Sequence, residues 1–311
     1  EDRQLKDTIT QSGKYELEAE KGVREIQWEV TSQNGKSVSY SAYFVGEKEE
    51  GISSETKQRA SDMIKKMEKN GYVKYLTQQE GADYWKTFGA AALGEKYLNG
   101  MLGYNVLKKN FSQSTDYSAV ILELVMSGEN PYDYLGVNYV KKLQEFNNSG
   151  DFGMYSANIW ALSALQAAGA PVPKETVEIV KKQALSETFD LDMRGWALYA
   201  TSLYKDTFTD KEYAKLIQSV KDIQIQKTTD MNGIDVTGVF ENFYYTNRNI
   251  MSHACMVTGL TAIGIDTGKN EWKGRNGADP VSVLEKYQLS TGGWFYSPEN
   301  PSQGGWNKDA V

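Results

Sequence analysis

A short phrase of small apolar residues that ends in glycine recurs along this 311-residue chain. It reads AAALG at 90–94, LELVMSG at 122–128, LSALQAAG at 162–169 and LTAIG at 260–264. The closing glycines are 34, 41 and 95 residues apart, and a related stretch without a terminal glycine, 196–203, lies inside the longest interval. Glycine suits a helix end because it adopts the left-handed conformation without steric cost. Recurrence at this interval predicts a repeat architecture.

From residue 54 onward the hydrophobic pattern alternates between charged, amphipathic helices and small, apolar ones. Because an apolar helix must be surrounded by protein, while an amphipathic helix keeps one face in water, we expect an inner and an outer layer. Six such pairs predict a mainly α fold, an (α/α)6 toroid of helix pairs; an open solenoid of the same pairs is the alternative. The predicted pairs are 55–70 with 81–93, 98–109 with 115–127, 134–146 with 156–168, 174–184 with 191–204, 210–225 with 249–263, and 279–288 with a helix that begins near Trp306.

The first 50 residues differ in pattern from the rest of the chain. Two stretches, 23–30 and 36–45, have strand patterning, and Asn34-Gly35 between them is a strong hairpin turn signal. We therefore predict an N-terminal segment, 1–50, with a small β-hairpin element. The toroid is expected over 51–311, with its last inner helix truncated at the end of the sequence.

Composition excludes several functional classes. The net charge of −7 and the pI near 5.1 argue against nucleic-acid partners, because there is no basic stripe to neutralise phosphates. The single cysteine, Cys255, excludes an internal disulfide and a cysteine-rich zinc site. No apolar run approaches the length of a membrane span, so we predict no membrane insertion.

The helix pairs, together with glycine-aromatic turns such as 150–153 and 292–295, resemble the α/α-toroid superfamily of terpene cyclases and protein prenyltransferases. Residues 80–311 more closely resemble bacterial secreted or cell-surface proteins with prenyltransferase-like repeats, a group similar to the α-domain of the vitamin B12 carriers intrinsic factor and transcobalamin. The stretches that carry this resemblance are 115–122, 190–193 with 197–198, and 258–266. The resemblance implies the fold and a secreted or cell-surface location, but one fold serves many functions.

One acidic pair coincides with a catalytic position of the family. The stretch 190–193, Asp-Leu-Asp-Met, falls where class II terpene cyclases carry an Asp-x-Asp-Asp proton donor. Here Met193 replaces the third acid and Arg194 follows it; a neighbouring cation would favour ionised carboxylates, the opposite of what a strong acid needs. We favour the alternative that Asp192 caps the following helix.

The sequence contains few residues that could form a histidine- or cysteine-based metal site. The zinc site of protein prenyltransferases resembles Asp-x-Cys with a distant histidine, whereas here His253 is the only histidine and stands two residues before Cys255. Three protein ligands are therefore hard to assemble, and Cys255 is expected to be a small core residue. The loop 266–279 is rich in oxygen ligands without the spacing of a calcium hand, so calcium stays an open alternative there. We predict no metal, no cofactor and no catalytic residue.

Aromatic and polar side chains gather where the predicted inner helices begin, and a closed ring would bring these ends to one mouth. Aromatic groups with a polar handle suit a wet binding cleft, although they could instead pack between the two layers. We predict a non-catalytic extracellular or cell-surface protein that binds a small molecule, such as a corrinoid, or a glycan. The alternatives are a terpene cyclase or prenyltransferase-like enzyme and a structural or adhesive surface module. The candidate ligand-binding residues are Tyr84, Trp85, Tyr117, Tyr155, Trp160, Asp190, Asp192, Arg194, Trp196 and Trp306.

Overall fold

The computed structural model describes residues 22–31, 37–46, 51–71, 84–93, 111–204, 207–226, 230–241 and 248–304. Over these residues the protein is mainly helical, as predicted, and the predicted helix at 98–109 lies outside them. The third amphipathic helix is shorter than predicted, because an antiparallel bridge between Tyr134 and Val137 forms a turn before it. The helices are α1 Ser54–Lys69, α3 Tyr84–Leu93, α5 Ser114–Met126, α6 Tyr139–Gln144, α7 Ala157–Ala167, α8 Lys174–Leu185, α9 Leu191–Thr201, α10 Asp210–Asp222, α11 Ile250–Ala262 and α12 Pro280–Tyr287.

Within the described segments, the strands form three antiparallel pairs. β1 (Gly22–Thr31) pairs with β2 (Ser37–Gly46), and the turn expected between them lies outside the described residues. Two further pairs were not anticipated from the sequence: β3 (Asp230–Met231) with β4 (Ile234–Asp235), and β5 (Phe295–Ser297) with β6 (Asn300–Gly304). The expected helix near Trp306 also lies outside the described part of the chain.

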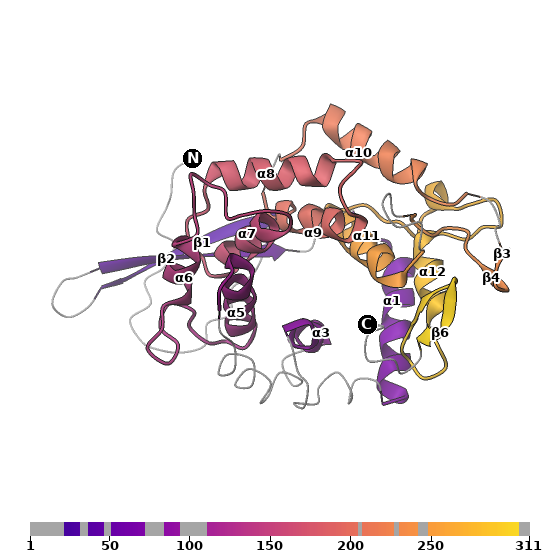
Figure 1. The fold of residues 1–311 in the computed structure, drawn as a ribbon, viewed down its shortest axis with the longest axis horizontal. Coiled ribbons are helices and arrows are strands. Elements are labelled where there is room, and N and C mark those ends of the chain that lie inside the picture. The colour runs from indigo at the N-terminus through magenta and orange to yellow at the C-terminus, as the bar shows by residue number, and fades with distance from the viewer. Residues whose placement is uncertain are drawn as a thin grey trace.

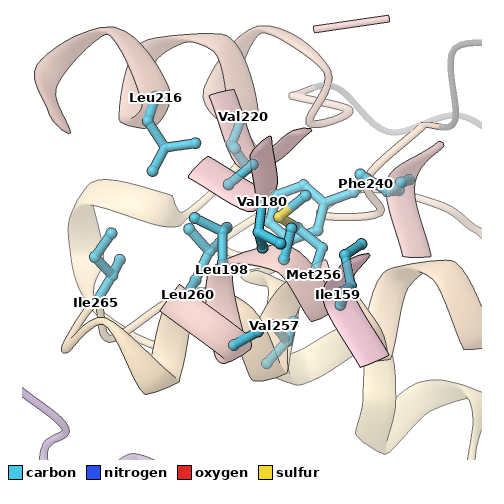
Figure 2. Close-up of a cluster of buried hydrophobic side chains, with 14 of the residues drawn as sticks. Ile159, Val180, Leu198, Leu216, Val220, Phe240, Met256, Val257, Leu260 and Ile265 are labelled. Carbon is cyan, nitrogen blue, oxygen red and sulfur yellow. The ribbon is translucent and has the colours of Figure 1, made fainter. Parts of the chain in front are cut away.

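The helices are arranged in two layers. In Figure 1, α5, α7, α9 and α11 form an inner arc, and α8 and α10 lie outside it. The largest cluster of buried apolar side chains fills the space between these layers, as Figure 2 shows. Removing this apolar surface from water is the main force that holds the layers together. The members of this cluster include Ile159 from α7, Val180 from α8, Leu198 from α9, Leu216 and Val220 from α10, and Met256 and Leu260 from α11.

Three of the four glycine phrases close helices in the predicted way, and the glycine of the fourth, Gly94, lies outside the described residues. Gly128, Gly169 and Gly264 follow α5, α7 and α11 with φ angles of 75°, 64° and 86°, in the left-handed region. After α5, the amide of Glu129 donates to the carbonyl of Leu124 at 2.8 Å, which satisfies a carbonyl that the helix end leaves open. Equivalent bonds follow α7 and α11, so the predicted role of these glycines is confirmed at all three.

The two inner helices α9 and α11 approach each other closely at a pair of glycines. A Cβ atom added at Gly195 would overlap the carbonyl of Cys255 and lie 2.7 Å from the amide nitrogen of Met256. A Cβ atom added at Gly259 would in turn overlap the carbonyl of Gly195. The two helix backbones therefore touch where neither helix carries a side chain.

Helices from the two ends of the helical region lie side by side. The Arg59 guanidinium of α1 binds Glu285 of α12 (Nε–Oε1 2.8 Å) and Asp279 at its N-terminus (Nη1–Oδ2 3.0 Å). Beyond the end of α12, the Gln288 amide donates to the carbonyl of Met63 at 3.0 Å. Since the starts of the helices meet and their later parts meet as well, α1 and α12 run in the same direction.

The loop after α11 makes a second connection to α1. The Asp266 carboxylate accepts hydrogen bonds from the amide of Ser53 (2.8 Å), the hydroxyl of Thr56 (2.7 Å) and the amide of Gly268 (2.9 Å). These bonds hold the pKa of Asp266 below its usual value, although burial opposes them. The acidic residue that sequence placed in a candidate calcium loop therefore anchors the N-terminus of α1.

The contact between α1 and α12 can be tested at Arg59. We expect Arg59→Ala to lower the free energy of unfolding by about 2 kcal/mol, because Asp279, only 4% exposed, would lose its cation. The matched control is Lys65→Ala on the same helix, which breaks an exposed pair with Asp62 and should cost less than about 0.5 kcal/mol. Urea denaturation followed by circular dichroism measures both. Equal losses in the two variants would contradict a stabilising role for this contact.

Candidate functional site

The structure brings four of the predicted ligand-binding residues close together. Trp160 of α7 and Trp196 of α9 have ring centroids 5.3 Å apart, and both side chains are half-buried. Asp192 lies one helical turn before Trp196, on the same face of α9, because residues four apart on a helix share a face. Asp190 immediately precedes this helix. These residues lie where α7, α9 and α11 meet.

Two aromatic residues that sequence reasoning missed extend this cluster. Phe88 of α3 lies 6.3 Å from Trp160, and Tyr199 of α9 lies 5.7 Å from Trp196, as measured between ring centroids. Tyr199 is 45% exposed, unusual for a large side chain on an inner helix. We call Phe88, Trp160, Trp196 and Tyr199 the aromatic row. The spacing of residues 192, 196 and 199 places them on one helix face, and this spacing could have predicted that Tyr199 belongs to the cluster. The sequence-based prediction considered only the residues at the helix starts.

Other predicted site residues lie elsewhere. Tyr117 packs against Phe111 (5.4 Å) and Phe146 (5.7 Å), and Tyr155 packs against Phe189 (5.5 Å) while remaining 55% exposed. Neither tyrosine contacts the aromatic row through any described ring pair. The backbone of Tyr84 and Trp85 begins α3, but their side chains, like the whole of Trp306, lie outside the described part of the structure.

Arg194 does not face the acidic pair, contrary to the sequence-based expectation. Arg194 is only 2% exposed; its guanidinium donates from Nε to the carbonyl of Ala184 on α8 at 2.9 Å and also binds the hydroxyl of Ser219 on α10. Burial lowers its pKa to about 10, and it stays charged at neutral pH. The cation that was expected to keep both carboxylates ionised therefore points into the outer layer.

The two carboxylates of the acidic pair, Asp190 and Asp192, have different hydrogen-bond partners. Asp190 caps the N-terminus of α9, because its side chain accepts a hydrogen bond from the amide of Asp192 at 3.3 Å. The sequence-based prediction that Asp192 is the cap is therefore wrong. One oxygen of Asp192 accepts a hydrogen bond from the hydroxyl of Ser252 on α11 at 3.1 Å. Burial, and next the neighbouring Asp190, raise the pKa of Asp192 to about 6. Asp192 is thus mainly ionised at neutral pH but accepts a proton in mild acid.

The histidine and cysteine of the candidate zinc motif are used structurally. His253 is fully buried; its Nδ1 accepts from the amide of Phe240 (3.1 Å), and its Nε2 donates to the carbonyl of Pro280 (2.8 Å). Both ring nitrogens are therefore engaged, and burial lowers the pKa of His253 to about 4. Burial, with the nearby charge of Asp192, raises the pKa of Cys255 to about 12, so its thiol stays neutral. Within the described ranges, no group of three or more acidic, histidine or cysteine side chains could hold a metal.

Positive charge is distributed unevenly between the layers. Helices α5, α7, α9 and α11 contain no lysine and one arginine, Arg194, whose guanidinium points outward, and they carry the acids Asp116, Glu123 and Asp192. The outer helices α8 and α10 together contain six lysines, for example Lys181 and Lys215. These four inner helices are consequently aromatic and mainly acidic, whereas lysines lie on α8 and α10 and, at Lys86, on α3, the helix that contributes Phe88.

No family model, no curated protein and no solved structure matches this chain. The resemblance to α/α-toroid proteins therefore stays a prediction. None of the helices in the described segments has the length and apolar character that crossing a bilayer requires.

Proposed function

We propose that this protein is a non-catalytic binding protein, secreted or displayed on a cell surface, that holds a small molecule or a glycan against the aromatic row. The observation that carries this proposal is the pairing of Trp160 and Trp196, half-buried and with ring centroids 5.3 Å apart; Asp192 lies one helical turn from Trp196 on the same face of α9. Large aromatic rings that stay partly in water next to one polar group are typical of ligand sites. If these rings served only to pack the core, full burial would stabilise the fold more than half-burial does, because more apolar surface would be removed from water.

We further propose that the helices close into an (α/α)6 toroid with a small β-hairpin element at the N-terminal side. The contact of Arg59 with Glu285 supports closure, because it joins helices whose contacting residues are 226 positions apart. The inner arc and outer helices in Figure 1 are consistent with such a ring. The secreted or cell-surface location follows from the resemblance to bacterial surface proteins with prenyltransferase-like repeats and to the α-domain of vitamin B12 carriers.

The two tryptophans provide the test of the binding proposal. We expect cyanocobalamin or a soluble N-acetylglucosamine oligosaccharide to quench the intrinsic tryptophan fluorescence, and Trp160→Ala and Trp196→Ala each to weaken binding about tenfold through lost ring contacts. Tyr213→Ala, which removes a 39% exposed ring from the outer helix α10, is the matched control and should leave the ligand affinity unchanged. If both tryptophan variants fold and bind unchanged, the site lies elsewhere. If both unfold, the rings belong to the core.

One observation favours a second candidate, an enzyme of the terpene cyclase type. Such an enzyme needs a carboxylic acid that holds its proton, and the raised pKa of Asp192 beside Asp190 is suited to that role. Arg194, which sequence analysis took as an argument against this role, faces away. Incubation with a polyprenyl diphosphate would test it: product formed by the natural protein and lost in Asp192→Asn would favour the enzyme over the binding protein.

A further inference from the structure

We propose that the aromatic row and Asp192 together bind a compact organic cation of the substituted ammonium class. This inference rests on the proposed binding function and narrows its ligand to one chemical class. It is carried by three independent observations: the inclination of the rings, the surroundings of the carboxylate and the distribution of charge between the two helix layers.

The rings of the aromatic row are inclined to one another. The planes of Trp160 and Trp196 differ by 46°, and those of Trp196 and Tyr199 by 82°. Rings at such angles cannot all stack on one flat ligand, so a sugar or a corrin ring would use only one of them. A compact cation can contact several ring faces at once, because the negative face of each ring attracts positive charge.

The carboxylate of Asp192 lacks a cationic partner among the described residues. The carboxylate interacts with the hydroxyl of Ser252, with the neighbouring Asp190 and with its own backbone. Arg194, the nearest cation in the sequence, is bound to the carbonyl of Ala184 and the hydroxyl of Ser219 instead. A ligand cation beside Asp192 would therefore supply a counter-charge, and the attraction would be stronger in this half-buried place than in bulk water.

The charge pattern of the layers selects a cation over an anion. Apart from Arg194 and the buried, neutral His253, the helices α5, α7, α9 and α11 have no basic side chain; the lysine of α3, Lys86, lies two residues before Phe88. On the face of α11 that meets α9, the groups beside Asp192 are the hydroxyl of Ser252 and the neutral thiol of Cys255. An anionic ligand in this place would meet the charge of Asp192 with no charged cation from the facing parts of α7, α9 and α11 to offset it, whereas a cation would meet both the carboxylate and the aromatic rings.

The experiment uses choline as the probe and its neutral isostere, 3,3-dimethylbutan-1-ol, as the control ligand. Isothermal titration calorimetry on the protein should show choline binding at neutral pH and at least about tenfold weaker binding of the isostere, because only choline carries the charge. Asp192→Asn, which keeps the shape of the side chain, and Trp196→Ala should each weaken choline binding about tenfold. Trp196→Phe should retain most of the binding, and Tyr213→Ala all of it.

The pH dependence provides a further readout that a merely structural role would not affect. Choline binding should weaken as the pH falls through about 6, because Asp192 then takes up a proton and loses its charge. Among the described residues, the titratable groups that interact with Asp192 are Asp190 and Cys255, whose thiol stays neutral, and α7 carries no titratable group. In Asp192→Asn this pH dependence should disappear.

The outcomes separate this inference from the proposed function. Equal binding of choline and its neutral isostere, or choline binding that is unchanged in Asp192→Asn and Trp196→Ala, would overturn the cation site. If choline does not bind, but an oligosaccharide or cyanocobalamin binds in a way that requires Trp196, the cation site is also overturned. The proposed binding function would then still hold. Failure of all these probes would count against both.

Discussion

Gly195→Ala is expected to lower the free energy of unfolding by about 3 kcal/mol or more, among the largest losses from a single added methyl group at the described glycines. The new Cβ atom would overlap the backbone carbonyl of Cys255 on the facing helix and crowd the amide of Met256. A flexible side chain could move aside, but a helix backbone cannot. Helices α9 and α11 would have to separate, and the packing of Leu198 and Leu260 in the apolar cluster around them would loosen.

A matched control separates this clash from the intrinsic cost of replacing glycine. Gly128→Ala places a methyl group in open space, but at a φ of 75°, which an alanine adopts at a cost of about 1 kcal/mol. Gly259→Ala, on the opposite side of the contact, should resemble Gly195→Ala, because its Cβ atom would overlap the carbonyl of Gly195. Urea denaturation at neutral pH measures all three. A loss at Gly195 no larger than that at Gly128 would mean that the helices do not touch there.

The second large effect is a loss of stability in mild acid that originates at His253. Burial lowers its pKa from 6.5 to about 4, so between these values the unfolded chain binds a proton that the folded protein excludes. Stability is therefore fully present above about pH 6.5 and is lost as the pH falls towards 4. The shift corresponds to about 3 kcal/mol. Because His253 is the only histidine, no other imidazole contributes to this window.

Asp192 acts in the opposite direction over nearly the same range. Its pKa is raised from 3.8 to about 6, so the folded protein binds the proton first and gains stability as the pH falls through this interval. Since the side chain is only half-buried, solvent screening reduces this contribution to about 1 kcal/mol. In the natural protein Asp192 partly offsets the acid sensitivity of His253.

The offset can be measured directly. Unfolding free energies from urea titrations at pH 7.5, 6, 5 and 4.5 give the slope for each protein. Asp192→Asn should be about 1 kcal/mol more stable at pH 7.5 and should lose stability more steeply than the natural protein below pH 6.5. His253→Asn, which can still donate and accept a hydrogen bond, should be less stable overall but nearly insensitive to pH in this window. Unchanged slopes in both variants would disprove the assignment.

Some of the site could have been predicted from the sequence and some could not. Asp192 and Arg194 are two residues apart on one helix, which places their side chains about 200° apart, so helix geometry already argued against pairing them. The aromatic row could have been anticipated at Trp196 and Tyr199 from their spacing, but not at Phe88. That residue lies on a different helix, and its distance from Trp160 depends on how the helices pack.

The helices and their ends follow from local sequence, because apolar periodicity and a glycine with a positive φ, such as Gly128 or Gly264, act within a few residues. The contact of α1 with α12, the glycine contact at Gly195 and the environment of Asp192 depend on residues distant in the chain. Burial, hydrogen-bond partners and pKa values arise from that packing. The tertiary arrangement therefore turned Arg194 outward and placed Cys255 of α11 against the face of α9 that carries Asp192 and Trp196.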